Sequence, residues 1–409
     1  MNKANGHSTI TRSGSPRSDS AVNLSGIAEG TTTPLRSVSI RGASVPLVHR
    51  GVLSHLGEHA HLAVILAFAA FVCRPDLSDL QSMPTLLQGA AQLVPGVPTF
   101  LAMIHVFSQS LGRAWADLVA HMGLGAFMTV GVFCYTTALY WSHALLMGVL
   151  DLSLRYPGSR LGAFARTHKI QDTRLVTVAD WIKCGIVVAR NQLLINIPVG
   201  IAMFGFIYPR ILAQKFPDML VVATSESVLA STAALTWTQS LPSLQQLGFG
   251  VTACVLAEEV LFYSTHRLFH FGPLYRRFHK THHSFTAPIG LAATYAHPVE
   301  HLLSNLLPVL ATPTLLGLHP FTALTWFTIA LTTTVHHHSG YELPGWPSSK
   351  MHDFHHYSSI YQFGVLGILD RFLHTDGGTR YARYVAKYEE RVHGGAVTVM
   401  PRSTSPAPM

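Results

Sequence analysis

The sequence predicts an all-α fold, a polytopic membrane helical bundle that carries a histidine-rich metal-binding cap. Two features of the composition predict the membrane: only 12% of the 409 residues are charged, about half the share usual in soluble proteins, and 48% are hydrophobic. Histidine predicts the cap, because 14 of the 25 histidines lie between residues 266 and 356. The net charge of +8 comes from basic residues scattered between apolar segments. We therefore expect a membrane surface as partner, and no nucleic acid.

Membrane-spanning helices are predicted where about 20 mainly apolar residues can cross the hydrocarbon core. Three long segments meet this condition, and two shorter ones predict a hairpin broken at His319-Pro320: residues 118–150, 186–212 and 241–266, then 302–318 and 321–334. Residues 62–72 are a further candidate span. Residues 83–107 contain prolines and polar side chains, which favours an interfacial position. The number of spans between residues 51 and 150 stays open.

The charge of one loop predicts the side on which the histidines lie. Residues 151–185 hold six Lys or Arg against three acidic residues, which predicts a cytosolic loop by the positive-inside rule. Two predicted crossings return the chain to the cytosol at residue 266, and the hairpin returns it there again. We therefore expect the histidine clusters and the N-terminal tail to be cytosolic.

The pattern divides the chain into four parts. Residues 1–50 are rich in Ser, Thr, Gly and Arg and predict a disordered basic tail, with a transit peptide as the alternative. Residues 51–184 hold the first membrane segments and the cytosolic loop, residues 185–385 form the histidine-rich domain, and residues 386–409 predict a disordered C-terminal tail. The four cysteines lie far apart in apolar segments, which predicts buried thiols and neither disulfides nor a zinc site.

Three histidine clusters, HRLFH, HKTHH and HDFHH, are the strongest motif. On an α-helix, residues i, i+3 and i+4 share a face, so each cluster can direct its imidazoles at one place. Eight imidazoles exceed the four ligands of a single tetrahedral zinc, so two ions are expected. A polar histidine surface without metal is the alternative. The eight predicted ligands are His266, His270, His279, His282, His283, His352, His355 and His356.

Two further residues lie on the same helical face as the first cluster. Glu259 and Tyr263 precede His266 and His270 at spacings of 4, 3 and 4 residues, which places all four in one stripe. A carboxylate below two ligand imidazoles can fix their tautomer and orientation. Pairing of Glu259 with a basic side chain is the alternative. Glu258 points about 100° away from this stripe and is not predicted to take part.

The order of these motifs resembles the fatty acid hydroxylase (sterol desaturase) superfamily. The matching segments are HRLFH, HKTHH, YAHPVEH, HHHSGYELP, HDFHH and the final LDR and HTD. The segments APIG (287–290), YAHP (295–298) and GY (340–341) resemble its C4-methylsterol oxidase branch and the group of fatty acid hydroxylase domain-containing protein 2. The resemblance adds His297 and His338 as metal ligands. Which of His301, His336 and His337 also bind stays open.

The resemblance implies a membrane-bound non-haem di-iron monooxygenase. It implies two Fe ions, a multi-pass position in the endoplasmic reticulum membrane, and a lipid substrate whose unactivated C–H bond is hydroxylated. The chain lacks a GxGxxG dinucleotide motif, so electrons from NAD(P)H are expected through cytochrome b5 or a reductase. Sterol 4-methyl oxidation is the first expectation and fatty acyl or sphingolipid hydroxylation the second, because Thr294 and residues 361–366 depart from the methylsterol oxidase pattern. A histidine-lined metal transporter and a metal-free pseudoenzyme are the more distant alternatives.

Overall fold

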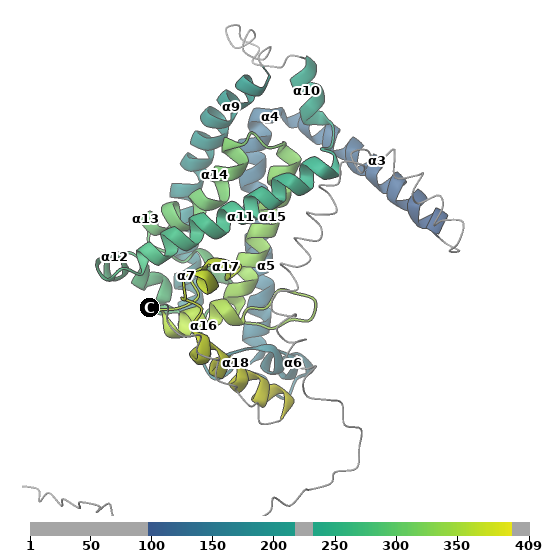
Figure 1. Ribbon diagram of the computed structural model, residues 1–409. Coiled ribbons are helices and arrows are strands. Elements are labelled where there is room, and N and C mark those ends of the chain that lie inside the picture. The colour runs from purple at the N-terminus through teal and green to yellow at the C-terminus, as the bar shows by residue number, and fades with distance from the viewer. Residues whose placement is uncertain (1–96, 217–231, 395–409) are drawn as a thin grey trace, which may run out of the picture. The chain divides into compact units, whose positions relative to one another are not determined.

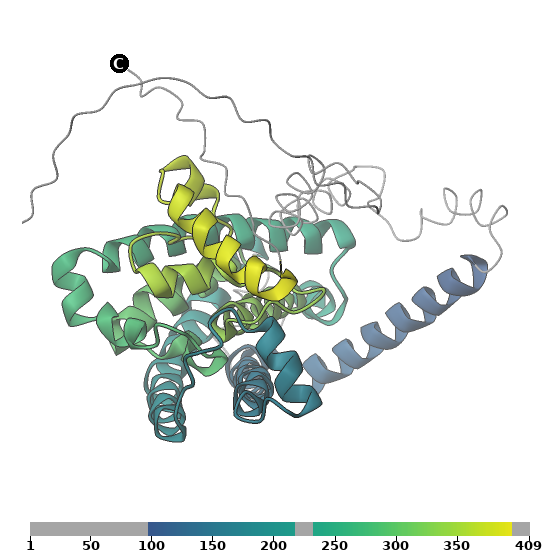
Figure 2. The ribbon, with the colours of Figure 1, turned by 90° about the horizontal axis from the view of Figure 1, so that it is seen from below.

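The computed structural model describes residues 97–216 and 232–394 (Figures 1 and 2). The predicted N-terminal tail, segment 62–72 and most of the predicted interfacial segment lie outside these residues. Within them every regular element is a helix, and the only pairing of strand type is an isolated bridge between Lys169 and Tyr341. The predicted all-α fold is confirmed.

In the described part of the chain, three continuous helices are long and apolar enough to cross a membrane, and each contains or overlaps a predicted span. They run over Leu124–Ser153, Val178–Lys215 and Leu244–Phe269. The first comprises α4 (Leu124–Ala126), η2 (Phe127–Gly131) and α5 (Val132–Ser153), and it follows α3 (Val97–Met122). The second comprises α7 (Val178–Asn191), η3 (Gln192–Asn196), α8 (Ile197–Gly200), η4 (Ile201–Ile207) and α9 (Tyr208–Lys215). The third is α11, which α10 (Thr232–Gln239) precedes.

The outer faces of these helices are apolar. Leu145, Leu194 and Phe249 are 56%, 65% and 61% exposed, one on each helix. Proline does not break the second helix, because π-helical turns on either side of Pro198 absorb the missing N–H donor. Apolar side chains pointing away from the protein core suit contact with lipid. The predicted membrane bundle is therefore supported by the surface as well as by helix length.

The predicted hairpin is present as two packed helical stretches. The first stretch consists of α13 (Pro298–Glu300), η8 (His301–Leu306) and α14 (Leu307–Leu315), and the second is α15 (Pro320–Ser339). The His319 side chain accepts a hydrogen bond from the Phe321 amide at 3.1 Å, and Pro320 occupies the first turn. This N-cap and the following proline start α15 because both satisfy or remove amide donors that a helix leaves unpaired.

Helix α15 lies at the centre of the bundle, packed against α5, α11 and α14. Its Trp326 and Phe327 belong to the largest core cluster, together with Phe204 and Val255 from the other spans. The short helix η7 (Gly290–Thr294) inserts between α5, α7 and α15, where Leu291 is buried in a second cluster. The central helix thus has a fixed position, and its last turn carries the sequence HHH.

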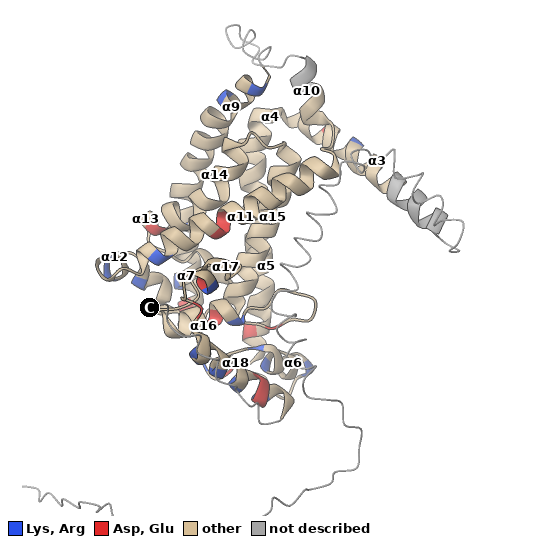
Figure 3. Cartoon of the chain, viewed as in Figure 1, with Lys and Arg blue, Asp and Glu red and all other residues tan. Residues whose placement is uncertain are grey.

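Short helices form a cap at one end of the bundle: α6 (Arg160–His168), α12 (Gly272–Arg277), η6 (His279–Ser284), α16 (Lys350–Ser358), α17 (Ile368–Phe372) and α18 (Gly378–His393). Figure 3 shows charged residues gathered on α6, α12, α16 and α18, while the middle of the bundle is nearly free of them. Helix α11 is the exception, because it carries the adjacent acids Glu258 and Glu259.

Helix α18 differs from the predicted C-terminal tail, because it continues to His393. The Tyr388 side chain is buried, Arg391 pairs with Asp172 at 2.7 Å, and Lys350 pairs with Glu389 at 2.9 Å. Residues 386–393 are polar on one side only, and their other side packs on the cap. The remaining residues of the predicted tail, 395–409, lie outside the described ranges.

Candidate metal centre

The histidines come together where the ends of four helices meet. His266 and His270 lie at the C-terminal end of α11, the HKTHH motif forms η6, His338 ends α15, and HDFHH forms most of α16. Gly340, whose φ of 66° is left-handed, ends α15 two residues after His338. Glycine adopts this conformation without strain, so the chain can turn away directly below the ligand.

Five imidazoles form the first cluster. The ligand atoms of His266, His270, His279, His283 and His355 all lie within 4.8 Å of one another. The Nε2 atom of His279 lies 2.8 Å from that of His270 and 3.0 Å from that of His283. The Nε2 atoms of His283 and His355 are 3.1 Å apart. Ligands about 2.1 Å from one metal ion and at right angles are about 3 Å apart, so these distances suit a shared ion.

Four imidazoles form the second cluster: His282, His338, His352 and His356. The Nε2 atom of His352 lies 2.9 Å from that of His338 and 3.1 Å from that of His356. His338 and His282 are joined by a longer Nε2 separation of 3.4 Å. All four side chains are at least partly buried. The geometry therefore provides two separate groups of imidazoles.

The outer nitrogens of these rings show which tautomer the site requires. Six Nδ1 atoms have an oxygen neighbour at 2.6–3.2 Å. The pairs are His266 with the Phe363 carbonyl, His279 with Glu300, His282 with the Tyr295 carbonyl, His283 with Ser359, His338 with the Thr334 carbonyl, and His355 with the Tyr361 carbonyl. A neutral imidazole has one N–H, so a ring that donates from Nδ1 has only a lone pair on Nε2. Four of the six face backbone carbonyl groups, which only accept, so those four rings turn an Nε2 lone pair into the clusters, where it can bind a metal ion. The residues present fit two metal ions.

Burial keeps these imidazoles neutral. Desolvation lowers the pKa of His282 to about 4. The same cause, together with the neighbouring imidazoles, lowers the pKa values of His270, His279 and His352 still further. Neutral imidazole is the form that binds metal. The clusters are therefore ready to bind metal at neutral pH.

The shared helical face predicted that each HxxHH motif would direct all its imidazoles at one place, and this prediction was wrong. His282 joins the second cluster while His279 and His283 join the first, and α16 divides in the same way. On α16, His352 and His356 are separated by about 40° around the axis, and His355 lies about 60° to the other side of His352. HKTHH is a 3₁₀-helix, whose tighter winding does not follow the α-helical rule.

His297 is not brought to either cluster. Its Nδ1 atom accepts a hydrogen bond from the Val299 amide at 3.2 Å, so the side chain caps α13. His301 lies 2.7 Å from Asn196, and His336 lies 3.0 Å from the Pro347 carbonyl. His338 is the member of the HHH trio that reaches a cluster, as the sequence predicted.

Glu259 and Tyr263 make their hydrogen bonds outside the histidine clusters. The Glu259 carboxylate accepts three backbone hydrogen bonds of 2.7–3.0 Å, from Val365, Leu366 and Leu369. These bonds hold the segment whose Phe363 carbonyl faces His266, so Glu259 acts on that imidazole indirectly, through this segment. The Tyr263 hydroxyl lies 3.0 Å from Thr375 and accepts a hydrogen bond from Arg267 at 2.8 Å.

Glu300 is the carboxylate that touches a clustered histidine, and the sequence reasoning did not single it out. Its Oε1 atom lies 2.6 Å from His279 Nδ1, and both side chains are 2% exposed. The signal was present in YAHPVEH, where an acid stands between two histidines at the start of an apolar hairpin. Burying a carboxylate in an apolar segment costs free energy, so such a residue is a candidate for a function.

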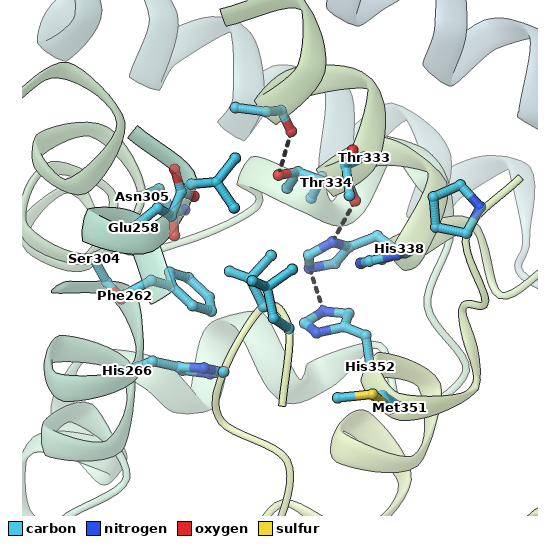
Figure 4. Close-up of a pocket in the computed structure, with 18 of the residues that line it drawn as sticks. Glu258, Phe262, His266, Ser304, Asn305, Thr333, Thr334, His338, Met351 and His352 are labelled. Carbon is cyan, nitrogen blue, oxygen red and sulfur yellow. Dashed lines mark hydrogen bonds between the residues drawn. The ribbon is translucent and has the colours of Figure 1, made fainter. Parts of the chain in front are cut away.

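A cavity of about 220 Å³ extends from the histidines into the bundle. Both clusters reach it, the first through His266 and His279 and the second through His282, His338 and His352. Apart from the histidines its lining is mainly apolar and includes Val255, Phe262, Trp326, Ala330 and Leu366. Figure 4 shows Glu258, Ser304 and Asn305 on one side of the cavity and Thr333, His338 and His352 on the other. Ile329, also at the cavity wall, is 39% exposed on the bundle surface.

Comparisons with known proteins agree with the resemblance inferred from the motifs. Residues 251–375 match the family model described as fatty acid hydroxylase. The chain is 44% identical over 138 residues to fatty acid hydroxylase domain-containing protein 2 of Homo sapiens, covering 34% of this chain and 41% of that protein. It is 38% identical over 138 residues to a fatty acid hydroxylase of Mycosarcoma maydis, covering 34% and 36%. It is 28% identical over 282 residues to a putative methylsterol monooxygenase of Dictyostelium discoideum, covering 67% and 93%.

The chain spans less than half the length of the first of these relatives. No solved structure matches it. The matched region contains the three boxes and His338. The predicted resemblance to the superfamily, and to its methylsterol oxidase branch, is confirmed.

Proposed function

We propose that this chain, which carries a fatty acid hydroxylase domain over residues 251–375, is a membrane-bound oxidoreductase that hydroxylates an unactivated C–H bond of a lipid with O2. The observation that carries the proposal is one arrangement: two groups of imidazoles line an apolar cavity inside a membrane bundle. A metal centre alone has many uses. Its position at the end of a lipid-accessible cavity favours a lipid substrate.

The ligand set favours iron as the metal. Sites made of imidazoles suit iron, copper and zinc, and two of these metals support redox chemistry. A pair of Fe ions held by the two clusters would supply the oxygen-activating chemistry. The ten predicted ligands then reduce to nine in our proposal, because His297 caps α13. Glu300 enters as the partner that orients His279.

The chain's own residues position the substrate and exclude water. Apolar residues such as Phe262 and Trp326 surround the lipid next to the histidines. Ile329 lines the cavity and is also exposed on the apolar outer face of the bundle, so in this proposal the lipid enters beside it. Outer hydrogen bonds hold the imidazoles in place, so that the ligand geometry does not depend on the bound lipid.

Electrons would come from NAD(P)H through cytochrome b5 or a reductase, at a cytosolic cap of a protein in the endoplasmic reticulum membrane. Arg276, Arg277 and Lys280 are exposed beside η6 and give this end a positive surface. Such a surface attracts an acidic electron carrier and speeds its encounter with the cap.

The substrate belongs to one of two lipid classes, sterols with a 4-methyl group or fatty acyl lipids. The names of the three relatives above cover both classes. Apolar burial does not distinguish them, since both classes are hydrophobic. The choice depends on polar groups in the cavity, which are considered below.

Metal analysis and oxygen consumption test the proposal together. The protein is expressed with ample iron, purified under anaerobic conditions, and supplied with a reductase and cellular lipid. We expect about two Fe per chain and lipid-dependent oxygen uptake, with the hydroxylated product identified by mass spectrometry. Lipid profiling of a deletion strain then identifies the class, because either 4-methylsterols accumulate or a hydroxy-acyl lipid disappears. One zinc per chain without oxygen uptake would disprove the proposal, and metal uptake into vesicles would favour a transporter.

A further inference from the structure

Glu258 presents an unpaired carboxyl group to the cavity. It is 7% exposed, and within the described part of the chain its Oε2 atom is buried without a hydrogen-bond partner. Its neighbour Glu259 points about 100° away around the helix and has three amide donors. Figure 4 shows Glu258 beside Ser304 and Asn305, in a cavity whose lining is mostly apolar.

An unpaired buried acid needs an account, because burying a polar group without a partner costs free energy. Within a membrane-spanning helix, an ionisable residue that faces a cavity is a candidate functional group. The neighbouring side chains do not supply a hydrogen-bond partner for the Glu258 Oε2 atom. Ser304 lies 3.4 Å from Thr265, and Asn305 lies 3.5 Å from His301, so both are directed at residues other than Glu258.

The position of Glu258 on α11 gives its distance along the helix axis from the histidine end of the cavity. Eight residues separate it from His266 on α11, which is about 12 Å along the helix axis. The cavity joins the two levels, since both residues line it. A bound lipid that reaches both would carry a polar group about 12 Å from the carbon next to the histidines.

We propose that Glu258 is a substrate-recognition residue that binds a hydroxyl or amide group of the lipid, remote from the carbon that is oxidised. A hydroxyl group suits the acid in either protonation state, because it can donate and accept. The inference rests on the proposed function for the reacting end only.

This arrangement separates the two substrate classes. In a 4-methylsterol the ring hydroxyl is on the carbon next to the one that bears the methyl group. That hydroxyl cannot bind Glu258 while the methyl group lies at the histidines, about 12 Å away. Glu258 therefore favours a chain lipid with a hydroxyl or amide group at its far end.

Binding to the full-length protein loaded with Zn²⁺, which does not turn over, tests the proposal without depending on catalysis. The probes are hexadecanol and hexadecyl methyl ether, measured by competition in lipid nanodiscs. We expect the wild type to bind the alcohol about tenfold more tightly than the ether, because the alcohol can both donate to the buried acid and accept from it, whereas the ether can only accept. Glu258→Leu should bind both equally, while Glu258→Gln should keep part of the preference. Thr333→Val, a change of similar size on the opposite wall, should keep it fully.

Three results would overturn the inference. The first is equal binding of the two probes by the wild type, and the second is an undiminished preference for the alcohol in Glu258→Leu. The third is a Glu258→Gln protein that loses zinc and unfolds, because this result would mean that Glu258 has a structural role. A 4-methylsterol should compete no better than its own O-methyl ether, and a preference that depends on Glu258 would contradict the 12 Å spacing. Failure of the proposed function would appear elsewhere, as an iron-loaded protein that consumes no oxygen.

Discussion

The two histidine clusters differ in the number and the support of their imidazoles. The first has five, and one of them, His279, is backed by the Glu300 carboxylate at 2.6 Å. The second has four, of which His282 and His338 are backed by backbone carbonyl groups. A carboxylate partner raises the basicity of an imidazole more than a carbonyl does. We therefore expect the first cluster to bind its metal more tightly, and the second to leave more positions open to other ligands.

Removing one imidazole from each cluster should have the largest effect. His355→Ala acts on the first cluster and His282→Ala on the second. Each should lower the metal content from about two ions to about one, and reduce hydroxylation by more than about 100-fold. Elemental analysis and product formation check both. His393→Ala, at an exposed histidine of α18, is the control. Full activity in either cluster variant would refute the assignment of the boxes.

Glu300→Gln should act on the first cluster only. Replacing the carboxyl group that backs His279 with an amide should lower metal affinity there by about 10- to 100-fold, with the second cluster unchanged. Titration with a chelator, followed by metal analysis, measures the two affinities separately. Glu390→Gln at an exposed site of α18 should change neither. Equal weakening of both clusters would mean that the carboxylate supports the cap as a whole.

Glu259→Gln should have a smaller effect on metal and a clear one on stability. The amide group of glutamine cannot accept all three backbone hydrogen bonds, so the free energy of unfolding should fall by about 2 kcal/mol. Affinity at the first cluster should fall less than in Glu300→Gln, because Glu259 reaches His266 only through residues 363–369. Thermal unfolding in detergent and the same chelator titration measure the two quantities. An unchanged unfolding temperature would remove Glu259 from this role.

Tyr384→Phe should have the smallest effect and should not distinguish the clusters. Its hydroxyl donates to Asp353 on α16, the helix that supplies histidines to both. We expect a loss of about 1 kcal/mol in the free energy of unfolding and equal small changes in the two affinities. Tyr156→Phe, at an exposed residue, is the control. A selective change at one cluster would show that α16 does not move as a unit.

The sequence was sufficient to predict the membrane bundle and the gathering of eight box histidines. Both rest on strong local patterns, long apolar segments and repeated histidine spacings. The choice of His338 from its trio agrees with the geometry, and it came from the family resemblance. The turn of the hairpin was also predictable, because His319-Pro320 is a strong helix-start signal.

The division of the boxes and the choice of carboxylate could not be predicted in this way. Both depend on contacts between segments far apart in the chain. Glu259 shares a helical face with His266, yet the segment after the last box lies between them, and the acid that touches a ligand comes from residue 300. His297 matched a family position, but Pro298 and the Val299 amide make it a helix cap. The second half of helix α18 fell in the predicted tail, although Tyr381, Tyr384 and Tyr388 recur at helical spacing.

Helix α16 places His355 in one histidine cluster and His352 and His356 in the other, so it is a spacer of fixed length between them. One residue inserted into this box would turn every later side chain by about 100° and would misdirect ligands of both sites at once. Residues added in a loop outside the helices would only lengthen a connection. We therefore expect the chain to tolerate changes of length in the loops between its boxes and none within the boxes, and the separation of the two clusters to depend on a single turn of helix.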